Sequence, residues 1–337
     1  MKTLITGIPK AELHLHIEGT LEPAMMLSIG KRNGLALPFP DVETAQKAYD
    51  FEDLQSFLDI YYKGASVLLH EQDFYDLTMA YLKKAVSQNV RHTEIFFDPQ
   101  THTSRGVAFE TVLDGITNAL RDGEKTFGIS TKLIMCILRH LSEKEGLETL
   151  ERSLDYRDRI AGIGLDSSET GNPPEKFAEL YERARGAGFL TVAHAGEEGH
   201  ADYIWQALKT LHVRRIDHGV HCMEDDTLVE ELVRQQIPLT VCPLSNIKLH
   251  VFASMRDHNL KTMLRRGLLV TVNSDDPAYF GGYVNENYLA VQKALRLEPG
   301  EIVTLAKNSF RASFLPEEQK KLRLLEMERW ISKHNPT

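Results

Sequence analysis

Four short polar clusters stand at the ends of apolar, strand-like runs of this sequence. They are His14-Leu15-His16, His194-Ala195-Gly196-Glu197, Arg215-Ile216-Asp217-His218 and Asn273-Ser274-Asp275-Asp276. Imidazole nitrogens and carboxylate oxygens are ligands of divalent metals, and neutral imidazole suits zinc. In a strand His14 and His16 point the same way, although a lone pair of this kind is weak evidence and Asp275-Asp276 can equally cap a helix. Their joint occurrence at strand ends predicts one metal site.

The clusters lie far apart along the chain, so only a closed fold brings them together. Short apolar runs alternate with amphipathic helical segments, which is typical of a mostly parallel sheet. Eight such runs favour a (β/α)8 TIM-type barrel, an α/β fold whose functional side chains gather at the carboxyl ends of the strands. The predicted strands span residues 11–16, 90–98, 131–139, 160–166, 190–194, 215–220, 238–242 and 269–273.

Two segments exceed the eight-unit pattern. Residues 35–72 are predicted as an inserted helical segment after the first strand, with Phe57 and Tyr61 at helical spacing. Periodicity alone favours a helix packed on the barrel, and the functional interpretation is a lid that excludes water from a site. Residues 299–333 are predicted as two C-terminal helices. Without a linker or a low-complexity segment, the chain is expected to form a single domain over residues 1–337.

Composition excludes several classes of protein. The net charge is −9 with no sustained Lys/Arg run, so a nucleic-acid partner is not expected. No apolar run reaches the ~20 residues of a membrane helix, and the N-terminus lacks the pattern of a signal peptide. Three cysteines, an odd number without a C-x-x-C motif, predict a reducing cytoplasm. The sequence does not predict an oligomeric state.

The second and third clusters also contain groups suited to proton transfer. Glu197 follows His194 by three residues, across a glycine that permits a tight turn. This cluster therefore offers a metal ligand together with a general acid or base. His218 ends the sixth predicted strand, whereas histidines outside the clusters, such as His102 and His140, are expected to be surface or packing groups.

These motifs, in this order, resemble the adenosine/adenine deaminase family. The residues that carry the resemblance are 9–20, 193–199 (Ala-His-Ala-Gly-Glu-Glu-Gly), 215–220 (Arg-Ile-Asp-His-Gly-Val), 242–246 (Cys-Pro-Leu-Ser-Asn) and 273–283. They cover nearly the whole chain, and their detail is most similar to the adenine deaminase branch. His16-Ile17-Glu18 also matches half of the motif of zinc deaminases that edit nucleic acids, but the other half, P-C-x-x-C, is absent.

The resemblance implies a ligand set and a reaction. It implies one zinc ion per chain, held by His14, His16, His194 and Asp275. It further implies that Glu197 is the proton donor, that His218 assists the attacking water and that Asp276 contacts the purine. The implied substrate is a small-molecule purine base, adenine, which is hydrolysed to hypoxanthine and ammonia in purine salvage. Three nitrogens and one oxygen suit zinc best, although iron or manganese fits the same donors.

Two positions bear on whether the substrate is a base or a nucleoside. Where this chain has Glu18, the adenosine-specific branch has Asp, which contacts the ribose, and the extra methylene would intrude on the sugar. Residues 165–169 lack the glycine that contacts purine N3 in adenosine deaminases, and Ser167 is expected nearby. A free base can also present N7–H to an ionised Asp276. Adenosine, N6-substituted adenines and a non-catalytic purine-binding barrel remain the alternatives.

Overall fold

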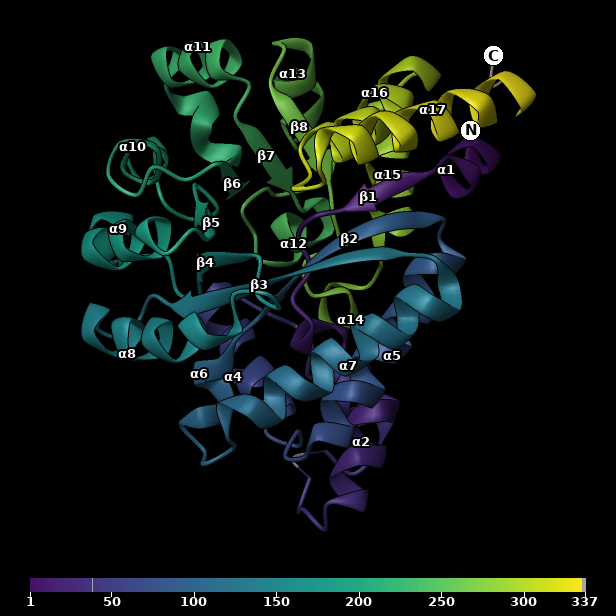
Figure 1. Ribbon diagram of the computed structural model, residues 1–337. Helices are drawn as coiled ribbons and strands as arrows, with labels where there is room; N and C mark the ends of the chain where they lie inside the picture. The colour runs from purple at the N-terminus through teal and green to yellow at the C-terminus, as the bar shows by residue number, and fades with distance from the viewer. Residues whose placement is uncertain (38, 335–337) are drawn as a thin grey trace.

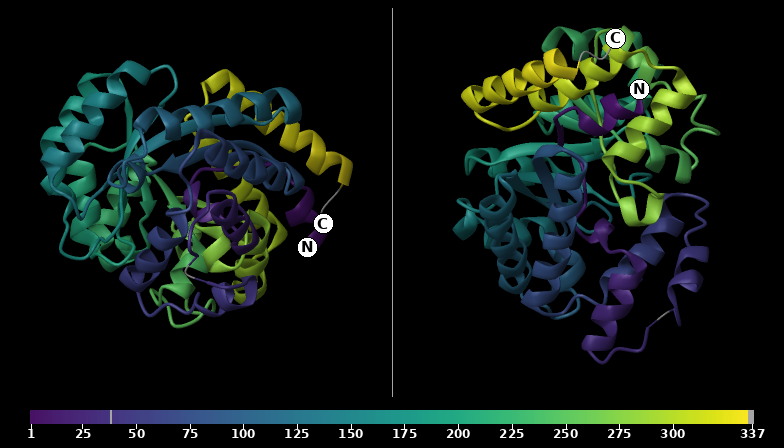
Figure 2. Two further views of the ribbon diagram at one scale, coloured as in Figure 1. Left: turned by 90° about the horizontal axis from the view of Figure 1, so that it is seen from below. Right: turned by 90° about the vertical axis from the view of Figure 1, so that its right-hand side faces the viewer.

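The computed structural model describes residues 1–37 and 39–334, and Figures 1 and 2 show how its elements are arranged. Eight parallel strands hydrogen-bond in chain order from β1 to β8. Their bounds are β1 Lys10–Glu12, β2 Val90–Phe97, β3 Ser130–Leu138, β4 Gly162–Asp166, β5 Leu190–Ala195, β6 Arg215–His218, β7 Pro238–Val241 and β8 Leu269–Val272. Helices surround the strands (Figure 1), which confirms the predicted (β/α)8 barrel.

The helices begin and end where local side chains satisfy their free backbone groups. Ser142 and Glu145 form a capping box before α8, and α7 ends at Gly128 in the left-handed conformation, as helix termini require. The helices are α1 Lys2–Gly7, α2 Pro23–Arg32, α3 Val42–Lys47, α4 Leu54–Ala65, α5 Glu71–Ser87, α6 Pro99–Thr103, α7 Phe109–Phe127, α8 Glu143–Ser153, α9 Ala178–Gly186, α10 Ala201–Lys209, α11 Asp226–Gln235, α12 Pro243–Lys248, α13 Leu260–Arg265, α14 Pro277–Phe280, α15 Val284–Leu295, α16 Pro299–Arg311 and α17 Glu317–His334.

The seam between β8 and β1 closes the barrel. β1 is shorter than the predicted first strand, because a side chain takes the next backbone donor: Leu13 N donates to Asn273 Oδ1 at 2.9 Å. Backbone pairing resumes further along, where Asp275 N donates to His14 O and His16 N donates to Asp275 O, both at 3.1 Å. The residues on the two sides of the seam are therefore held together by the backbone itself.

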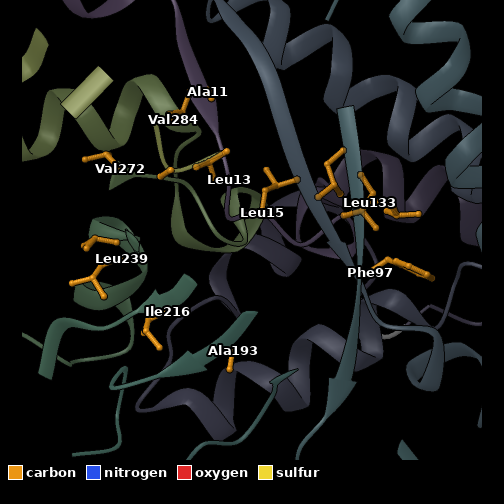
Figure 3. Packing of buried hydrophobic residues seen from close by; sticks show 14 of the residues in the cluster. Ala11, Leu13, Leu15, Phe97, Leu133, Ala193, Ile216, Leu239, Val272 and Val284 are labelled. Atoms are coloured by element: carbon orange, nitrogen blue, oxygen red, sulfur yellow. The ribbon is translucent and has the colours of Figure 1, made fainter. Parts of the chain in front are cut away.

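Side chains of residues 13–16 point alternately into the barrel and outward to the hydrophobic core. Leu13 and Leu15 are fully buried in the hydrophobic core, which also contains Ile216, Leu239 and Val272 (Figure 3). His14 and His16 have the opposite phase, so they point into the barrel. The same local pattern thus supplies packing on one face and polar chemistry on the other.

The two predicted additions are helical in the structure. α3 and α4 lie within the predicted insertion, whose residue 38 is outside the described residues, as are residues 335–337. α16 and α17 occupy the predicted C-terminal segment, and α16 packs on the seam, where Ser309 Oγ accepts from Ala11 N at 2.8 Å. Across the described ranges, no helix combines the length and apolar character needed to cross a membrane.

Candidate active site

The carboxyl ends of the strands bring the four predicted metal ligands into contact distance. His14 Nε2 lies 3.1 Å from Asp275 Oδ1, and His16 Nε2 lies 3.6 Å from the same oxygen. His16 Nε2 and His194 Nε2 are 3.1 Å apart. All four residues are buried, so solvent does not compensate this crowding of donor atoms.

These donor atoms fit a divalent metal. Ligand atoms of a tetrahedral zinc site are about 3.4 Å apart when the metal–ligand distance is about 2.0–2.1 Å, and the observed separations of 3.1–3.6 Å bracket that value. His14 Nε2 has no hydrogen-bond partner among the described residues, and a cation would satisfy it. His218 is a fifth donor, since ligand atoms of His14, His194, His218 and Asp275 lie within 4.8 Å of one another.

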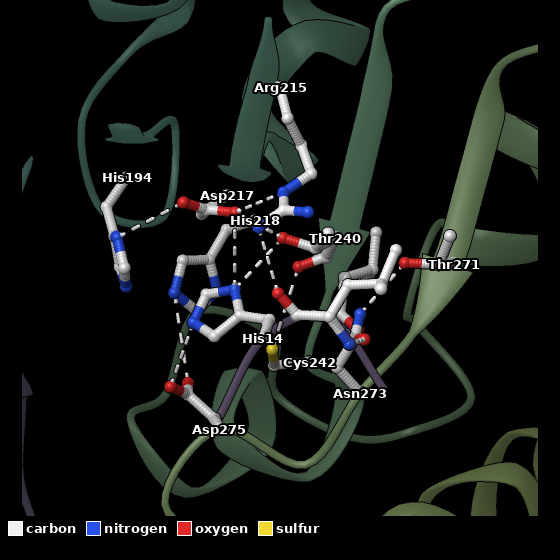
Figure 4. A network of polar contacts seen from close by, with 12 residues as sticks. His14, His194, Arg215, Asp217, His218, Thr240, Cys242, Thr271, Asn273 and Asp275 are labelled. Carbon is white, nitrogen blue, oxygen red and sulfur yellow. Dashed lines mark hydrogen bonds and ion pairs between the residues drawn. The ribbon is translucent and has the colours of Figure 1, made fainter. Parts of the chain in front are cut away.

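Polar contacts behind the histidines set their orientation (Figure 4). Thr240 Oγ1 donates to Asp217 Oδ1 at 2.8 Å, so it accepts from His14 Nδ1 at 3.0 Å. His14 Nδ1 therefore carries the proton, and Nε2 keeps its lone pair for a metal. Asp217 Oδ2 also lies 3.8 Å from His194 Nδ1. One carboxylate thus stands behind two of the proposed ligands.

Asp217 is itself anchored in a fully buried network of ion pairs. Arg215 Nε lies 3.3 Å from Asp217 Oδ1, and the same guanidinium pairs with Glu94 and donates to Leu13 O. Burial alone would raise the pKa of Glu94, but the charge of Arg215 and the contact with His92 lower it to about 2. Because Arg215 and Thr240 both contact Asp217 Oδ1, the carboxyl group of Asp217 is held facing the histidines.

Glu197 and His218 stand together at the edge of the cluster. Glu197 Oε2 lies 3.5 Å from His218 Nε2, which lies 3.8 Å from Asp275 Oδ2. Burial, followed by the charge of Asp275, raises the pKa of Glu197 well above its usual range. Burial, followed by the nearby His14, lowers the pKa of His218 to about 3. The site therefore places a carboxyl group with a raised pKa beside an imidazole with a lowered pKa, a combination suited to proton transfer.

A cavity lies over this cluster. Its empty volume is about 380 Å³, which includes space open to solvent. The strand ends supply its polar wall, and α4 supplies Leu54, Phe57, Leu58, Tyr61 and Tyr62. An apolar helix facing polar strand ends suits a flat ring with hydrogen-bonding edges.

The sequence relationships agree with this geometry. The family model described as adenosine deaminase matches residues 9–329. The chain belongs to the adenosine deaminase family. Adenine deaminase of Chlorobium phaeobacteroides (strain BS1) is 76% identical over 320 residues, which cover 95% of this chain and 96% of that protein.

Solved structures of related proteins have the same fold. A crystal structure of adenine deaminase from Arthrobacter aurescens has a TM-score of 0.95 and 54% identity, and the match covers 97% of this chain and 100% of that one. An amidohydrolase from Burkholderia ambifaria, crystallised with bound Zn, has a TM-score of 0.89 and 25% identity, and the match covers 98% and 94% of the two chains.

In this member of the adenosine deaminase family, Asp276 packs against Gly19. Asp276 lines the cavity and is buried. Burial, followed by the charge of Asp275, raises the pKa of Asp276 well above its usual range. A raised pKa favours the protonated carboxyl group, which can donate a hydrogen bond, and the ionised acceptor expected from the sequence stays a prediction. A Cβ on Gly19 would overlap the Asp276 carboxylate, so the absence of a side chain at residue 19 lets Asp276 reach its place.

We therefore expect Gly19→Ala to lower kcat/KM for a purine substrate by about 10²-fold, because misplacing a positioning group by about 1 Å has an effect of that size. The matched control is Gly186→Ala, since a Cβ there meets no atom within 4 Å. Steady-state kinetics and the melting temperature of both variants provide the measurement. Unchanged kcat/KM in folded Gly19→Ala would show that Asp276 tolerates displacement.

The loop that carries Glu197 is held by a single carboxylate. Glu169, fully buried, accepts hydrogen bonds from the backbone N–H groups of Gly196, Glu197, Glu198 and Gly199 at 2.7–3.0 Å. Four donors on one carboxylate make a strong, directional anchor. Glu169 was not predicted as a site residue, although an acid just after the fourth strand was a visible signal.

We expect Glu169→Gln to lower kcat by about 10-fold or more while leaving the metal content unchanged. An amide accepts through one oxygen only, and its NH2 group would face backbone donors, which costs about 1–3 kcal/mol per unpaired buried group. Kinetics, elemental analysis and calorimetry on Glu169→Gln and on the exposed control Glu175→Gln measure the effect. Equal kcat in the two variants would contradict this role of Glu169.

The two residues predicted to distinguish base from nucleoside lie in different places. Ser167 lines the cavity, and its Oγ is bonded to Tyr62 OH at 2.9 Å and to His140 Nδ1 at 2.8 Å. Glu18 is fully buried and does not line the cavity. Its Oε1 accepts from Asp98 N at 3.2 Å, and a clash between Glu18 and a ribose stays a prediction.

Two carboxylates of the cavity wall were missed by the sequence prediction. Asp98 and Asp166 line the cavity at the carboxyl ends of β2 and β4. Asp166 Oδ2 lies 3.4 Å from His16 Nδ1, so it contacts this predicted ligand as Asp217 contacts His194. Both end predicted strands, and the rule that selected Asp275 would have found them.

Proposed function

We propose that this protein hydrolyses adenine to hypoxanthine and ammonia at one zinc ion. The observation that carries the proposal is the contact of Glu197 Oε2 with His218 Nε2, 3.5 Å apart, at the edge of a buried histidine and aspartate cluster. Adenine as substrate is supported by relatives named adenine deaminase at 76% and 54% identity. Zinc is supported by the bound Zn of the Burkholderia ambifaria relative.

The proposed ligands are His14, His16, His194 and Asp275. When bound, zinc supplies the Lewis acidity that makes a water molecule a nucleophile near neutral pH. We assign His16 to the ligand set because its Nε2 faces His194 Nε2 at 3.1 Å. We assign His218 to proton transfer because its Nε2 lies between two carboxylates, 3.5 Å from Glu197 and 3.8 Å from Asp275.

In the proposed reaction Glu197 protonates purine N1, which makes C6 electrophilic. Neutral His218 orients the attacking water and accepts its proton as the oxygen bonds to C6. That proton passes to the 6-amino group, and the proton of the new C6–OH group returns to the Glu197 carboxylate. The C6–N bond then breaks, and ammonia leaves the 6-oxo group of hypoxanthine behind. Protonated Asp276 donates a hydrogen bond to N7, and Ser167 is placed near N3.

We also propose that α4 acts as a lid. Glu198 Oε1 accepts from Leu54 N at 3.2 Å at the start of this helix, and the Tyr62–Ser167 hydrogen bond ties it to the rim at 2.9 Å. The apolar side chains of α4 would exclude water from the cavity and strengthen the electrostatic interactions within it.

The test is an ultraviolet absorbance assay of zinc-loaded protein with adenine, adenosine and N6-isopentenyladenine in separate reactions. We expect turnover of adenine in preference to the other two. Preference for adenosine would overturn the assignment of a free base. Absence of turnover with all three would support a non-catalytic purine-binding barrel.

The proposed partner is thus a small purine base, and the proposed role is purine salvage. Cys136, Cys222 and Cys242 are free and buried, which agrees with the cytoplasmic location expected from the sequence. We retain the single domain over residues 1–337 as part of this proposal.

A further inference from the structure

A carboxyl group with no role in the proposed reaction faces the purine cavity. Asp98, at the carboxyl end of β2, lines the cavity and is 3% exposed. Its Oδ2 accepts from Tyr61 OH at 3.4 Å. Its Oδ1 has no hydrogen-bond partner among the described residues, and the neighbouring polar group is the Asp166 carboxyl, since donor atoms of His16, Asp98 and Asp166 lie within 4.8 Å of one another. A buried acceptor without a partner is costly, so this oxygen marks a place where a ligand donor would be favourable.

Residues outside the cavity hold the backbone of Asp98 in place. Asp98 N donates to Glu18 Oε1 at 3.2 Å, and the same oxygen lies 2.9 Å from His102 Nε2. His102 Nδ1 in turn contacts Arg105 Nη2 at 2.9 Å. Pro99 begins α6 immediately after Asp98. The backbone that carries Asp98 is therefore anchored on both sides, and the hydrogen bond from Tyr61 OH orients the carboxyl group.

In the proposed pose, every polar group of the purine except N9 faces a named protein group. C6 faces the metal cluster, N1 faces Glu197 and N7 faces Asp276. The remaining nitrogen of the five-membered ring is N9, which is separated from N7 by one carbon. Donor atoms of Asp98 and of Asp276 each lie within 4.8 Å of a ring nitrogen of His16, so both carboxyl groups border this ring on the cavity wall.

We propose that Asp98 accepts a hydrogen bond from N9–H of the free base and so selects bases over nucleosides. In a nucleoside N9 carries a sugar carbon, which removes the donor and places bulk against the carboxyl group. A site built to bond an N–H group rejects ligands that lack it, because its own polar group is left unpaired. Glu18 thus favours the base indirectly, by holding Asp98. This inference rests on the proposed adenine deamination.

The first experiment compares kcat/KM for adenine and 9-methyladenine in zinc-loaded wild type, Asp98→Ala and Tyr61→Phe. We expect the wild-type ratio to favour adenine and to fall by at least about tenfold in Asp98→Ala, as loss of the paired acceptor predicts. Tyr61→Phe keeps the carboxyl group but removes the hydroxyl that donates to Asp98 Oδ2, so its preference should lie between those of the wild type and Asp98→Ala. Asp59→Ala, the same change at an exposed residue of α4, should retain the wild-type ratio. An unchanged ratio in Asp98→Ala would overturn the proposal.

The second experiment needs no variant and remains decisive if Asp98→Ala does not fold. Wild-type protein is assayed with an adenine analogue in which sulfur replaces N9–H, so that the ring keeps N7 but loses the donor. We expect kcat/KM at least about tenfold below that of adenine, and equal values would overturn the role of Asp98. Turnover of adenine by the wild type tests the proposed function separately, so the failure of one is distinguishable from the failure of the other.

Discussion

Glu197→Gln is expected to lower kcat for adenine by about 10²- to 10⁴-fold, the usual contribution of general acid–base catalysis. Glutamine keeps the size of the side chain but carries no acidic proton, so it cannot protonate N1. The side chain contacts His218 at 3.5 Å and is not among the four proposed ligands. We therefore expect one zinc per chain to remain bound, as measured by elemental analysis beside steady-state kinetics.

The control for this substitution is Glu151→Gln, the same chemical change at an exposed residue of α8. We expect it to have wild-type kcat and metal content. Retained activity in Glu197→Gln would remove Glu197 from the role of proton donor. Loss of zinc in the same variant would instead assign it to the ligand set.

His194→Ala is expected to lose the metal and with it all measurable turnover. The remaining donors, His14, His16 and Asp275, are buried, so the apoprotein keeps polar atoms crowded together without a cation. Metal bound only to the folded state adds about 4 kcal/mol of stability when its concentration is a thousand times Kd. Chelation of the wild type should therefore lower both activity and melting temperature, and added zinc should restore them.

The matched control is His200→Ala, because the His200 side chain is 85% exposed. It should bind one zinc and melt as the wild type does, both with and without chelator. Elemental analysis and calorimetry separate the two variants. A full zinc complement in His194→Ala would show that the proposed ligand set is wrong and would favour His218 as the fourth donor.

The sequence predicted most of the polar residues at the carboxyl ends of the strands, because the patterns that mark them are local. His194 and Asp275 were found as polar residues that follow apolar runs, and the position of such runs depends only on neighbouring residues. Asp98 and Asp166 carry the same signal at the ends of β2 and β4, so they were within reach of the same rule. Glu169 was not found, because its value lies in four hydrogen bonds to a loop 27 to 30 residues away.

The sequence by itself determined which side chains share one end of the barrel. Strand periodicity turns His14 and His16 inward, and strand–helix alternation brings the carboxyl ends of all eight strands together. These features follow from backbone geometry, which neighbouring residues set. The nature of the cluster as a candidate metal site was therefore readable without coordinates.

Only the tertiary structure decided where each polar atom is directed, because that depends on partners distant in sequence. Thr240, 226 residues from His14, fixes which nitrogen of that ring is free. His102, 84 residues from Glu18, pairs with the Glu18 carboxylate, which does not line the cavity. Asp98, rather than Glu18, lines the cavity. Side-chain direction in a packed interior is set by these long-range contacts, and local sequence does not contain them.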